Sequence, residues 1–335
     1  MSSSGNGSSL LDVRNIRVSF RSGRPDLPPA RAVEGVSFRV KAGETVGVVG
    51  ESGCGKSVTG LTIMGLIPSP PGQIDSGEVV FEGVDLLGLS PGQMRRIRGK
   101  EIAMVFQEPM TSLNPIFTVG SQIVEAILVH EKVSKNEARA RTIELLNRVQ
   151  IPDPASRFGS YPHELSGGLR QRAMIAMALA CSPKLLIADE PTTALDVTIQ
   201  AQILELIQEL REEMGMAVML ITHDLGVVAH SAERVVVMYA GRVVEESPIV
   251  PLYDAPLHPY TRGLLKSIPG RNVGKKRLPV IPGTVPAASA KPPACHFHPR
   301  CPYVRDVCRT QDPELRPIED GRLARCWAVG DWLDM

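Results

Sequence analysis

The stretch that decides the fold is residues 50–57, which read Gly50-Glu51-Ser52-Gly53-Cys54-Gly55-Lys56-Ser57. It matches the pattern G-x-x-x-x-G-K-[ST] in full, between an apolar segment at residues 44–49 and an expected helix at about residues 56–64. Glycines let the backbone wind tightly, so that successive N–H groups point at phosphate oxygens beside the positive end of the helix. The stretch therefore predicts the phosphate-binding loop of an α/β nucleotide-binding protein.

Within this loop, Lys56 is expected to reach the β- and γ-phosphates of ATP, and the Ser57 hydroxyl to coordinate Mg²⁺. Cys54 should contribute mainly its backbone, and its thiol is given no role. The remaining expected ATP contacts in and just after the loop are Ser52, Gly53, Gly55 and Val58.

A second motif follows the apolar residues 185–188, which predict a buried strand that ends in two carboxylates. We expect Asp189 to complete the Mg²⁺ shell. Glu190 is expected to polarise the attacking water and is the predicted catalytic base.

Working outward from these motifs, apolar periodicity predicts strands at residues 11–20, 33–40, 44–49, 78–81, 102–106, 185–188 and 217–221, with a hairpin at 234–244. Helices are predicted at residues 56–64, 119–130, 165–180 and 198–214, and another opens at a Ser134/Glu137 capping box and runs to about residue 149. Strands that alternate with helices, several of them wholly apolar, indicate a mostly parallel α/β sheet.

The bulk properties limit the possible roles of the chain. Its 335 residues are more than one compact domain usually needs, and the net charge of +1 does not favour a nucleic-acid partner. No stretch reaches the roughly 20 apolar residues that span a bilayer. Residues 1–9 are rich in Ser and Gly and do not resemble a signal peptide, so we expect a cytoplasmic location and a membrane role only through partners.

Further motifs resemble those of the ABC ATPase family, in family order from residue 11 to about residue 245. Leu165-Ser166-Gly167-Gly168-Leu169-Arg170-Gln171 is similar to the ABC signature, with Leu169 where the commonest form has Gln. The other matching residues are Gln107 (Q-loop), Ala194-Leu195-Asp196 (D-loop), His223 (switch histidine) and Phe20 (the aromatic residue against adenine).

The resemblance implies a RecA-like P-loop NTPase fold with an antiparallel β portion and a helical subdomain. Ser166, Gly167 and Gly168 would face the γ-phosphate of ATP bound by a second subunit, so that two chains sandwich two ATP molecules. Asp196 would contact ATP, and His223 would position and stabilise charge. Gln107 would bind Mg²⁺ and water and report the loss of the γ-phosphate to the helical segment.

Composition changes divide the chain into expected domains. Residues 1–10 are expected to be disordered, and residues 11–267 to form the ATPase domain, with the helical subdomain at about 108–180. Residues 268–335, rich in Pro, Arg and Cys, are expected to form a Cys-rich C-terminal extension.

This extension holds four of the six cysteines, Cys295, Cys301, Cys308 and Cys326, spaced by five, six and seventeen residues. Four thiolates in a loop-rich segment suit a tetrahedral metal or an iron–sulfur cluster. The spacing lacks the C-x-x-C pair usual for structural zinc and therefore favours an iron–sulfur cluster over zinc. Zinc is the alternative, with His296 and His298 as substitute ligands.

Residues 51–53, 107–115 and 258–261, together with the Cys pattern, resemble ATP-binding subunits of oligopeptide and dipeptide importers, some of which carry a [4Fe–4S] cluster. The resemblance implies ATP-driven peptide import at the cytoplasmic face of the membrane. The implied partners are a second, distinct ATPase chain, two permease subunits and an extracytoplasmic peptide-binding protein. The alternatives are import of nickel or another small solute, and a soluble ABC ATPase acting in DNA repair or on ribosomes.

Overall fold

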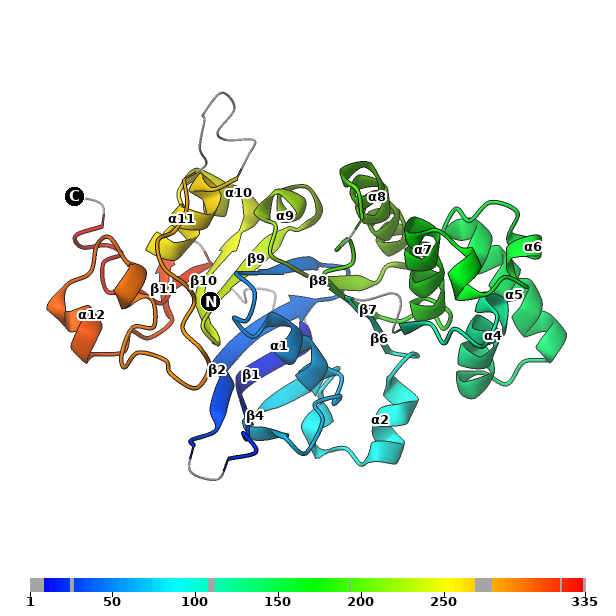
Figure 1. Ribbon diagram of the computed structural model, residues 1–335, viewed down its shortest axis with the longest axis horizontal. Coiled ribbons are helices and arrows are strands. Elements are labelled where there is room, and N and C mark those ends of the chain that lie inside the picture. The colour runs from blue at the N-terminus through cyan, green and yellow to red at the C-terminus, as the bar shows by residue number, and fades with distance from the viewer. Residues whose placement is uncertain are drawn as a thin grey trace, which may run out of the picture. The chain divides into compact units, whose positions relative to one another are not determined.

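The computed structural model of the protein describes residues 9–24, 27–107, 112–193, 195–268, 279–319 and 321–333 (Figure 1). The chain forms two compact units. Unit 1 comprises Met1–Lys41, Thr45–Leu87 and Ile221–Met335, and unit 2 comprises Ala42–Glu44 and Gly88–Leu220. This division by compactness is separate from the domains expected from the sequence, whose boundaries stay predictions.

Unit 1 is built from strands and short helices. Its strands are β1 (Ser9–Phe20), β2 (Ala30–Lys41), β3 (Thr45–Val49), β4 (Gly72–Phe81), β5 (Val84–Asp85), β9 (Arg234–Tyr239), β10 (Arg242–Pro248), β11 (Arg316–Glu319) and β12 (Arg322–Ala324). Its helices are α1 (Lys56–Ile63), α9 (Leu225–Ser231), α10 (Ile249–Asp254), α11 (Pro259–Lys266) and α12 (Asp306–Thr310), with a 3-10 turn at His298–Arg300.

Two sets of strands organise this unit. The strands β2, β1, β4 and β5 form an antiparallel sheet in that order. The strands β11, β12, β10, β9 and β3 lie side by side in a second sheet, where β3 runs parallel to β9 and the other described pairings are antiparallel. Residues after position 315 therefore extend the sheet that carries the phosphate-binding loop, through the pairing of Glu245 with Ala324.

The first strand begins earlier than the sequence predicted. Ser9 and Leu10 were expected in a disordered N-terminus, but both belong to β1. Ser9 is paired with Lys41, its hydroxyl donates to the carbonyl oxygen of Leu11 at 2.6 Å, and Leu10 is buried. The burial of Leu10 and the pairing of Ser9 with β2 therefore extend the strand into a segment whose polar composition had predicted disorder.

Unit 2 carries most of the long helices. They are α2 (Pro91–Ile97), α4 (Val119–His130), α5 (Lys135–Arg148), α6 (Pro154–Arg157), α7 (Gly167–Ala178) and α8 (Val197–Met214), with a 3-10 turn at Pro162–Glu164. Its strands β6 (Ile102–Val105) and β7 (Leu185–Asp189) pair in parallel, and β8 (Ala217–Thr222), which lies next to β7, passes into unit 1 at its end. A 3-10 turn at Leu86–Gly88 lies where the chain enters this unit.

Most of the predicted elements are present within one to three residues, and the larger differences have local causes. Strand β4 begins at Gly72 rather than at residue 78, because its first half pairs with the end of β1. Helix α2 was not predicted. Ser90 and Gln93 form a reciprocal capping box around Pro91, a start signal that the sequence does contain. Helix α7 begins at Gly167, with Ser166 as its N-cap.

The packing of α4 gives a test of the fold. Gly120 lies in this helix, and a β-carbon there would overlap the ring of Phe158. Gly120→Ala should therefore overpack the site and lower the free energy of unfolding by about 1–3 kcal/mol, measured by urea or thermal unfolding of the full chain.

A glycine in α2 provides the matched control. Gly92 is exposed, and no heavy atom lies within 4 Å of where its β-carbon would be. Gly92→Ala should leave stability unchanged or raise it by up to about 1 kcal/mol, because alanine favours the helix. Equal stability of the Gly120→Ala protein and the wild type would contradict the close packing.

Candidate nucleotide-binding and catalytic site

The phosphate-binding loop lies between β3 and α1, as the sequence predicted. All five residues of β3 are buried, so the start of the loop is held by the core of unit 1. Gly53 and Gly55 have φ values of 80° and 102°, which residues other than glycine rarely adopt. A β-carbon at Gly55 would also lie 2.7 Å from the carbonyl oxygen of Ala32. Both geometry and space therefore require glycine at residue 55.

Lys56 is the first residue of α1 and is buried, at 4 % exposure. Its Nζ donates to the carbonyl oxygens of Gly50 at 2.7 Å and Glu51 at 3.3 Å, so the ammonium group is held inside the curve of the loop. Ser57 and Val58 follow in the same first turn. The loop thus places one cation at the N-terminus of a helix, and both features favour the binding of phosphate.

Cys54 is a fully buried residue of the loop. Its side chain is buried, and burial raises the pKa of the thiol. Its carbonyl oxygen accepts a hydrogen bond from the N–H of Gly241 at 2.9 Å. Cys54 is therefore a neutral, inward-facing residue that fixes the loop, and Ser52 beside Gly53 is exposed.

Two other predicted residues lie in unit 1. Phe20 ends β1, where its backbone pairs with Ala30 and Gly72, and it is half-buried. His223 is exposed between β8 and α9. It lines a cavity of about 200 Å³ whose other lining residues are Asp224, Leu225, Leu264, Ser267 and Ile268.

Unit 2 holds the predicted catalytic carboxylate. Gln107 follows β6 and Glu190 follows β7, and because these strands are parallel and adjacent, both residues lie at the same edge. Gln107 Nε2 donates to Glu190 Oε2 at 3.2 Å, and the hydroxyl of Thr193 donates to the same oxygen at 2.9 Å. One carboxylate oxygen therefore has two donors that fix its direction.

Glu190 also has a strained backbone, with a φ of 45°. Residues other than glycine adopt this region at a cost, and such strain is concentrated at functional sites. Asp189, one residue earlier, is the buried last residue of β7, at 5 % exposure. The strand thus delivers one enclosed and one accessible carboxylate.

The predicted D-loop is described in part, because Ala194 lies outside the described residues. Asp196 is the N-cap of α8, and its Oδ1 accepts the N–H of Ile199 at 3.0 Å. The carboxylate therefore has a structural role at the start of this helix, and its expected contact with ATP stays a prediction.

The signature residues form the start of α7, which begins two residues later than the predicted helix. Ser166 caps the helix, and its hydroxyl accepts the N–H of Leu169 at 3.4 Å. A β-carbon at Gly168 would lie 3.0 Å from Cγ2 of Ile199 in α8. Gly168 therefore leaves the first turn of α7 without a side chain at this position. It also permits the close packing of α7 against α8, which the sequence did not predict.

The structure brings some of the predicted site residues together and assigns others to separate units. The phosphate-binding loop, Phe20 and His223 belong to unit 1. Gln107, Asp189, Glu190 and the signature residues belong to unit 2. Their joint action on one nucleotide stays a prediction.

The four C-terminal cysteines line one small cavity of about 10 Å³, beside His258 and His298. Burial raises the pKa of Cys295 to about 11 and that of Cys301 to about 12, and it raises the pKa of Cys326 as well. Within the described part of the chain, no group of three or more His, Cys, Asp or Glu side chains could hold a metal ion. All four cysteines line this cavity, but the space that it encloses is about that of one water molecule.

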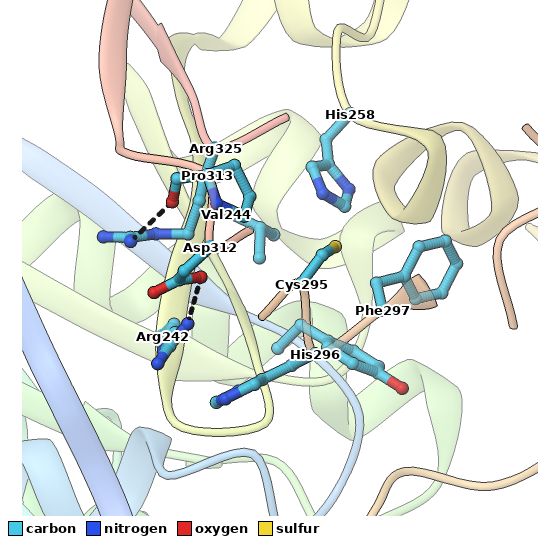
Figure 2. A pocket seen from close by; sticks show the side chains of 10 residues that line it. Arg242, Val244, His258, Cys295, His296, Phe297, Asp312, Pro313 and Arg325 are labelled. Carbon is cyan, nitrogen blue, oxygen red and sulfur yellow. Dashed lines mark hydrogen bonds and ion pairs between the residues drawn. The ribbon is translucent and has the colours of Figure 1, made fainter. Parts of the chain in front are cut away.

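The histidines considered as substitute ligands have other partners. Nδ1 of His296 lies 3.1 Å from the carbonyl oxygen of Ala240, and Nδ1 of His298 lies 2.9 Å from that of Cys295. Figure 2 shows the residues that line a second cavity, and this cavity shares Cys295, His258 and Phe297 with the first. Burial lowers the pKa of His258 to about 3, so its ring is neutral there.

Sequence reasoning missed three residues that contact the site. Thr193 orients Glu190, and the sequence pattern that could have indicated this is a hydroxyl residue three positions after the carboxylate. Arg300 and Tyr260 of the C-terminal region both contact Glu51 of the phosphate-binding loop. Because they are more than 200 residues from Glu51 in the sequence, no local pattern indicates these contacts.

Comparison with protein families gives two matches. Residues 33–193 match the ABC transporter family, and residues 244–308 match the oligopeptide/dipeptide transporter C-terminal region. The first match contains the phosphate-binding loop, Gln107, the signature and both strand-end carboxylates. The second contains Tyr260, Arg300 and three of the four C-terminal cysteines.

Curated relatives are similar over almost the whole chain. A probable peptide ABC transporter ATP-binding protein of Sinorhizobium fredii is 55 % identical over 97 % of both chains. A dipeptide transport ATP-binding protein of Escherichia coli is 53 % identical over 95 % of this chain and 96 % of its own. An oligopeptide transport ATP-binding protein of Bacillus subtilis is 50 % identical, with 96 % and 97 % covered.

Solved structures agree on the fold. A dimeric ATP-binding cassette in a post-hydrolysis state with ADP and Pi has a TM-score of 0.63 at 29 % identity, covering 71 % of this chain and 98 % of its own. No helix in the described part of the chain is long and apolar enough to cross a membrane. The protein has the ABC ATPase cassette fold, and the chain belongs to the ABC transporter family, among the ATP-binding proteins of oligopeptide and dipeptide transporters.

Proposed function

We propose that this protein hydrolyses ATP to drive the import of dipeptides and oligopeptides, as a peripheral subunit on the cytoplasmic face of the membrane. The observation that carries the proposal is the 50–55 % identity, over at least 95 % of the chain, to ATP-binding proteins named for peptide, dipeptide or oligopeptide transport. Similarity of this extent includes the C-terminal region as well as the ATPase core.

In the proposed reaction, the triphosphate of ATP lies on the backbone N–H groups of residues 52–57, and Lys56 exchanges its bonds to loop carbonyls for bonds to phosphate. Phe20 supports adenine. Oxygen donors suit Mg²⁺, and the side chains proposed to hold it are those of Ser57, Asp189 and Gln107. Bound Mg²⁺ would neutralise phosphate charge.

Glu190 acts in this proposal as the general base. Gln107 and Thr193 both donate to one carboxylate oxygen, which orients the carboxylate that accepts the proton of the attacking water. The water oxygen forms a bond to the γ-phosphorus while the bond to the β-phosphate oxygen breaks, and ADP leaves. His223 positions the γ-phosphate.

The proposed assembly has two ATPase chains, two permease subunits and an extracytoplasmic peptide-binding protein. Ser166, Gly167 and Gly168 would close on ATP held by the partner ATPase, a distinct chain, and Asp196 would lie at the same interface. The dimeric state of a solved relative supports this arrangement. Gln107 contacts Glu190 and would pass the loss of the γ-phosphate on to the segment that follows it.

Removal of the lysine in the phosphate-binding loop tests nucleotide binding. Lys56→Ala should weaken Mg·ATP binding at least about tenfold, because it removes the cation from the phosphate-binding loop. Titration of the purified full chain with a fluorescent ATP analogue measures this. Lys135 is the matched control, since it is also the first residue of a helix, and Lys135→Ala should bind as the wild type does.

Replacement of the proposed catalytic base tests the rate of ATP hydrolysis. Glu190→Gln should retain ATP binding, because the amide keeps the shape, but lose at least about a hundredfold in turnover through loss of the base. Phosphate release by the assembled transporter, together with uptake of a labelled dipeptide, measures this. Turnover at the wild-type rate would exclude Glu190 as the base, and nickel uptake without peptide uptake would change the proposed cargo. Recovery only with ribosomes or DNA would exclude a transport role.

The Cys-rich C-terminal extension is proposed to hold a structural metal centre on Cys295, Cys301, Cys308 and Cys326. The proposal is based on all four cysteines lining one cavity, although in the described residues they do not form a group placed to hold a metal ion. Their sulfur donors suit a [4Fe–4S] cluster, with zinc as the second choice. The cavity is too small for either group at its present size, so the segment would have to open around it.

Purification without oxygen tests this centre. We expect about four irons and four sulfides per chain and a broad absorption band at about 400 nm, and each Cys→Ser change in the cluster should abolish the band. Cys181→Ser, which changes a buried cysteine of unit 2, should leave the iron content unchanged. A content of one zinc per chain without sulfide would identify the centre as a zinc site. Protein that contains neither iron nor zinc would exclude both centres.

A further inference from the structure

The phosphate-binding loop carries an acidic residue, Glu51, directly after its first glycine. A carboxylate next to bound phosphates raises their energy by repulsion between like charges, and more strongly where water is partly excluded. The side chain of Glu51 is 33 % exposed, so solvent screens it only in part. ATP binding at this loop therefore requires that the charge of Glu51 be neutralised or directed away.

Arg300 neutralises this charge. Its Nη1 donates to Oε2 of Glu51 at 2.8 Å and its Nη2 to Oε1 at 3.0 Å, so the two planar groups pair through two parallel hydrogen bonds. The side chain of Arg300 is only 4 % exposed. Solvent screens a pair at this mostly enclosed site less than it screens a surface ion pair, and removing one partner would leave the other charge uncompensated.

The guanidinium group of Arg300 is itself held in place. Its Nε donates to the carbonyl oxygen of Pro282 at 2.8 Å and its Nη2 to that of Ile281 at 3.3 Å. The hydroxyl of Tyr239 lies 3.4 Å from Nη1. Arg300 is thus a fixed anchor within the C-terminal region rather than a mobile surface cation.

The backbone of Glu51 is held by the same region. Its N–H donates to the hydroxyl of Tyr260 at 2.9 Å. Tyr260 is fully buried in an aromatic cluster, with ring centroids 4.7 Å from Tyr239 and 5.5 Å from Phe297. Residues after position 258 therefore fix both the main chain and the side chain of Glu51.

We propose that Arg300 is a positioning residue for the nucleotide site, which holds the Glu51 carboxylate away from the phosphates and, with Tyr260, sets the conformation of the phosphate-binding loop. The proposal rests on the proposed function, since it assumes that ATP binds at this loop. It gives the C-terminal region a direct part in nucleotide affinity.

A double-mutant cycle tests the proposal, with Mg·ATP affinity of the purified full chain as the readout. Arg300→Ala should weaken ATP binding about tenfold, because the Glu51 charge is released towards the phosphates. Glu51→Gln should bind ATP at least as tightly as the wild type. Adding Arg300→Ala to Glu51→Gln should cost less than about twofold, because no charge remains to be neutralised.

The cycle separates positioning from a general structural role. If Arg300 only stabilised the C-terminal region, its removal would weaken binding equally in the wild-type chain and in the Glu51→Gln variant, and this result would overturn the proposal. Arg305 is the matched control, since its guanidinium packs over Trp332 at 4.2 Å in the same region. Arg305→Ala should leave the affinity unchanged.

A second variant covers the case in which Arg300→Ala does not fold. Arg300→Lys keeps the charge but loses the paired geometry, and it should weaken binding by an intermediate factor that Glu51→Gln abolishes. Wild-type affinity in every Arg300 variant would overturn the inference and leave the ATPase proposal intact. Failure of the wild type to bind ATP would instead contradict the proposed function.

Discussion

The conformation of the phosphate-binding loop depends on the close approach of three backbone segments around Ala32. A β-carbon at Gly55 or at Gly241 would lie 2.7 Å from the carbonyl oxygen of Ala32. The N–H of Gly241 donates to Cys54, and the carbonyl oxygen of Gly241 accepts the N–H of Glu34 at 2.8 Å. Strand β2, the phosphate-binding loop and the β9–β10 turn are thus in direct main-chain contact, and each limits the conformation of the other two.

Charges within unit 1 extend this constraint to the C-terminal region. Glu34 of β2 accepts hydrogen bonds from Lys291 at 3.2 Å and from Arg242 at 3.1 Å, and its side chain is 9 % exposed. Burying such charges is costly unless each is paired. The C-terminal segment must therefore pack in the one position in which these charges are paired. Burial and the nearby Arg242 lower the pKa of His296, which keeps its ring neutral beside this cluster. The loop that binds phosphate and the segment that carries the cysteines therefore fold as parts of one compact unit.

The features that the sequence predicted are local ones. The glycine pattern, the buried strand before it and the helix after it all follow from neighbouring residues, and so do the N-caps at Ser134 and Ser166. The contact between Gln107 and Glu190 was not predicted, and the parallel pairing of β6 and β7 provides its physical reason. The pairing of Arg300 with Glu51 could not be predicted, because it joins residues 249 positions apart and depends on how the C-terminal region folds back.

The cysteine segment shows why spacing alone does not determine a metal site. The four cysteines are far from any C-x-x-C pattern, yet the fold places them around one cavity, with the N–H of Cys295 bonded to the carbonyl oxygen of Cys308. Burial keeps at least three of the thiols protonated, since it raises the pKa of Cys295, Cys301 and Cys326. A metal would have to displace those protons and widen the cavity, so loading would be coupled to a local rearrangement. Because Arg300 directly precedes Cys301, such a rearrangement would begin one residue from the contact that holds Glu51.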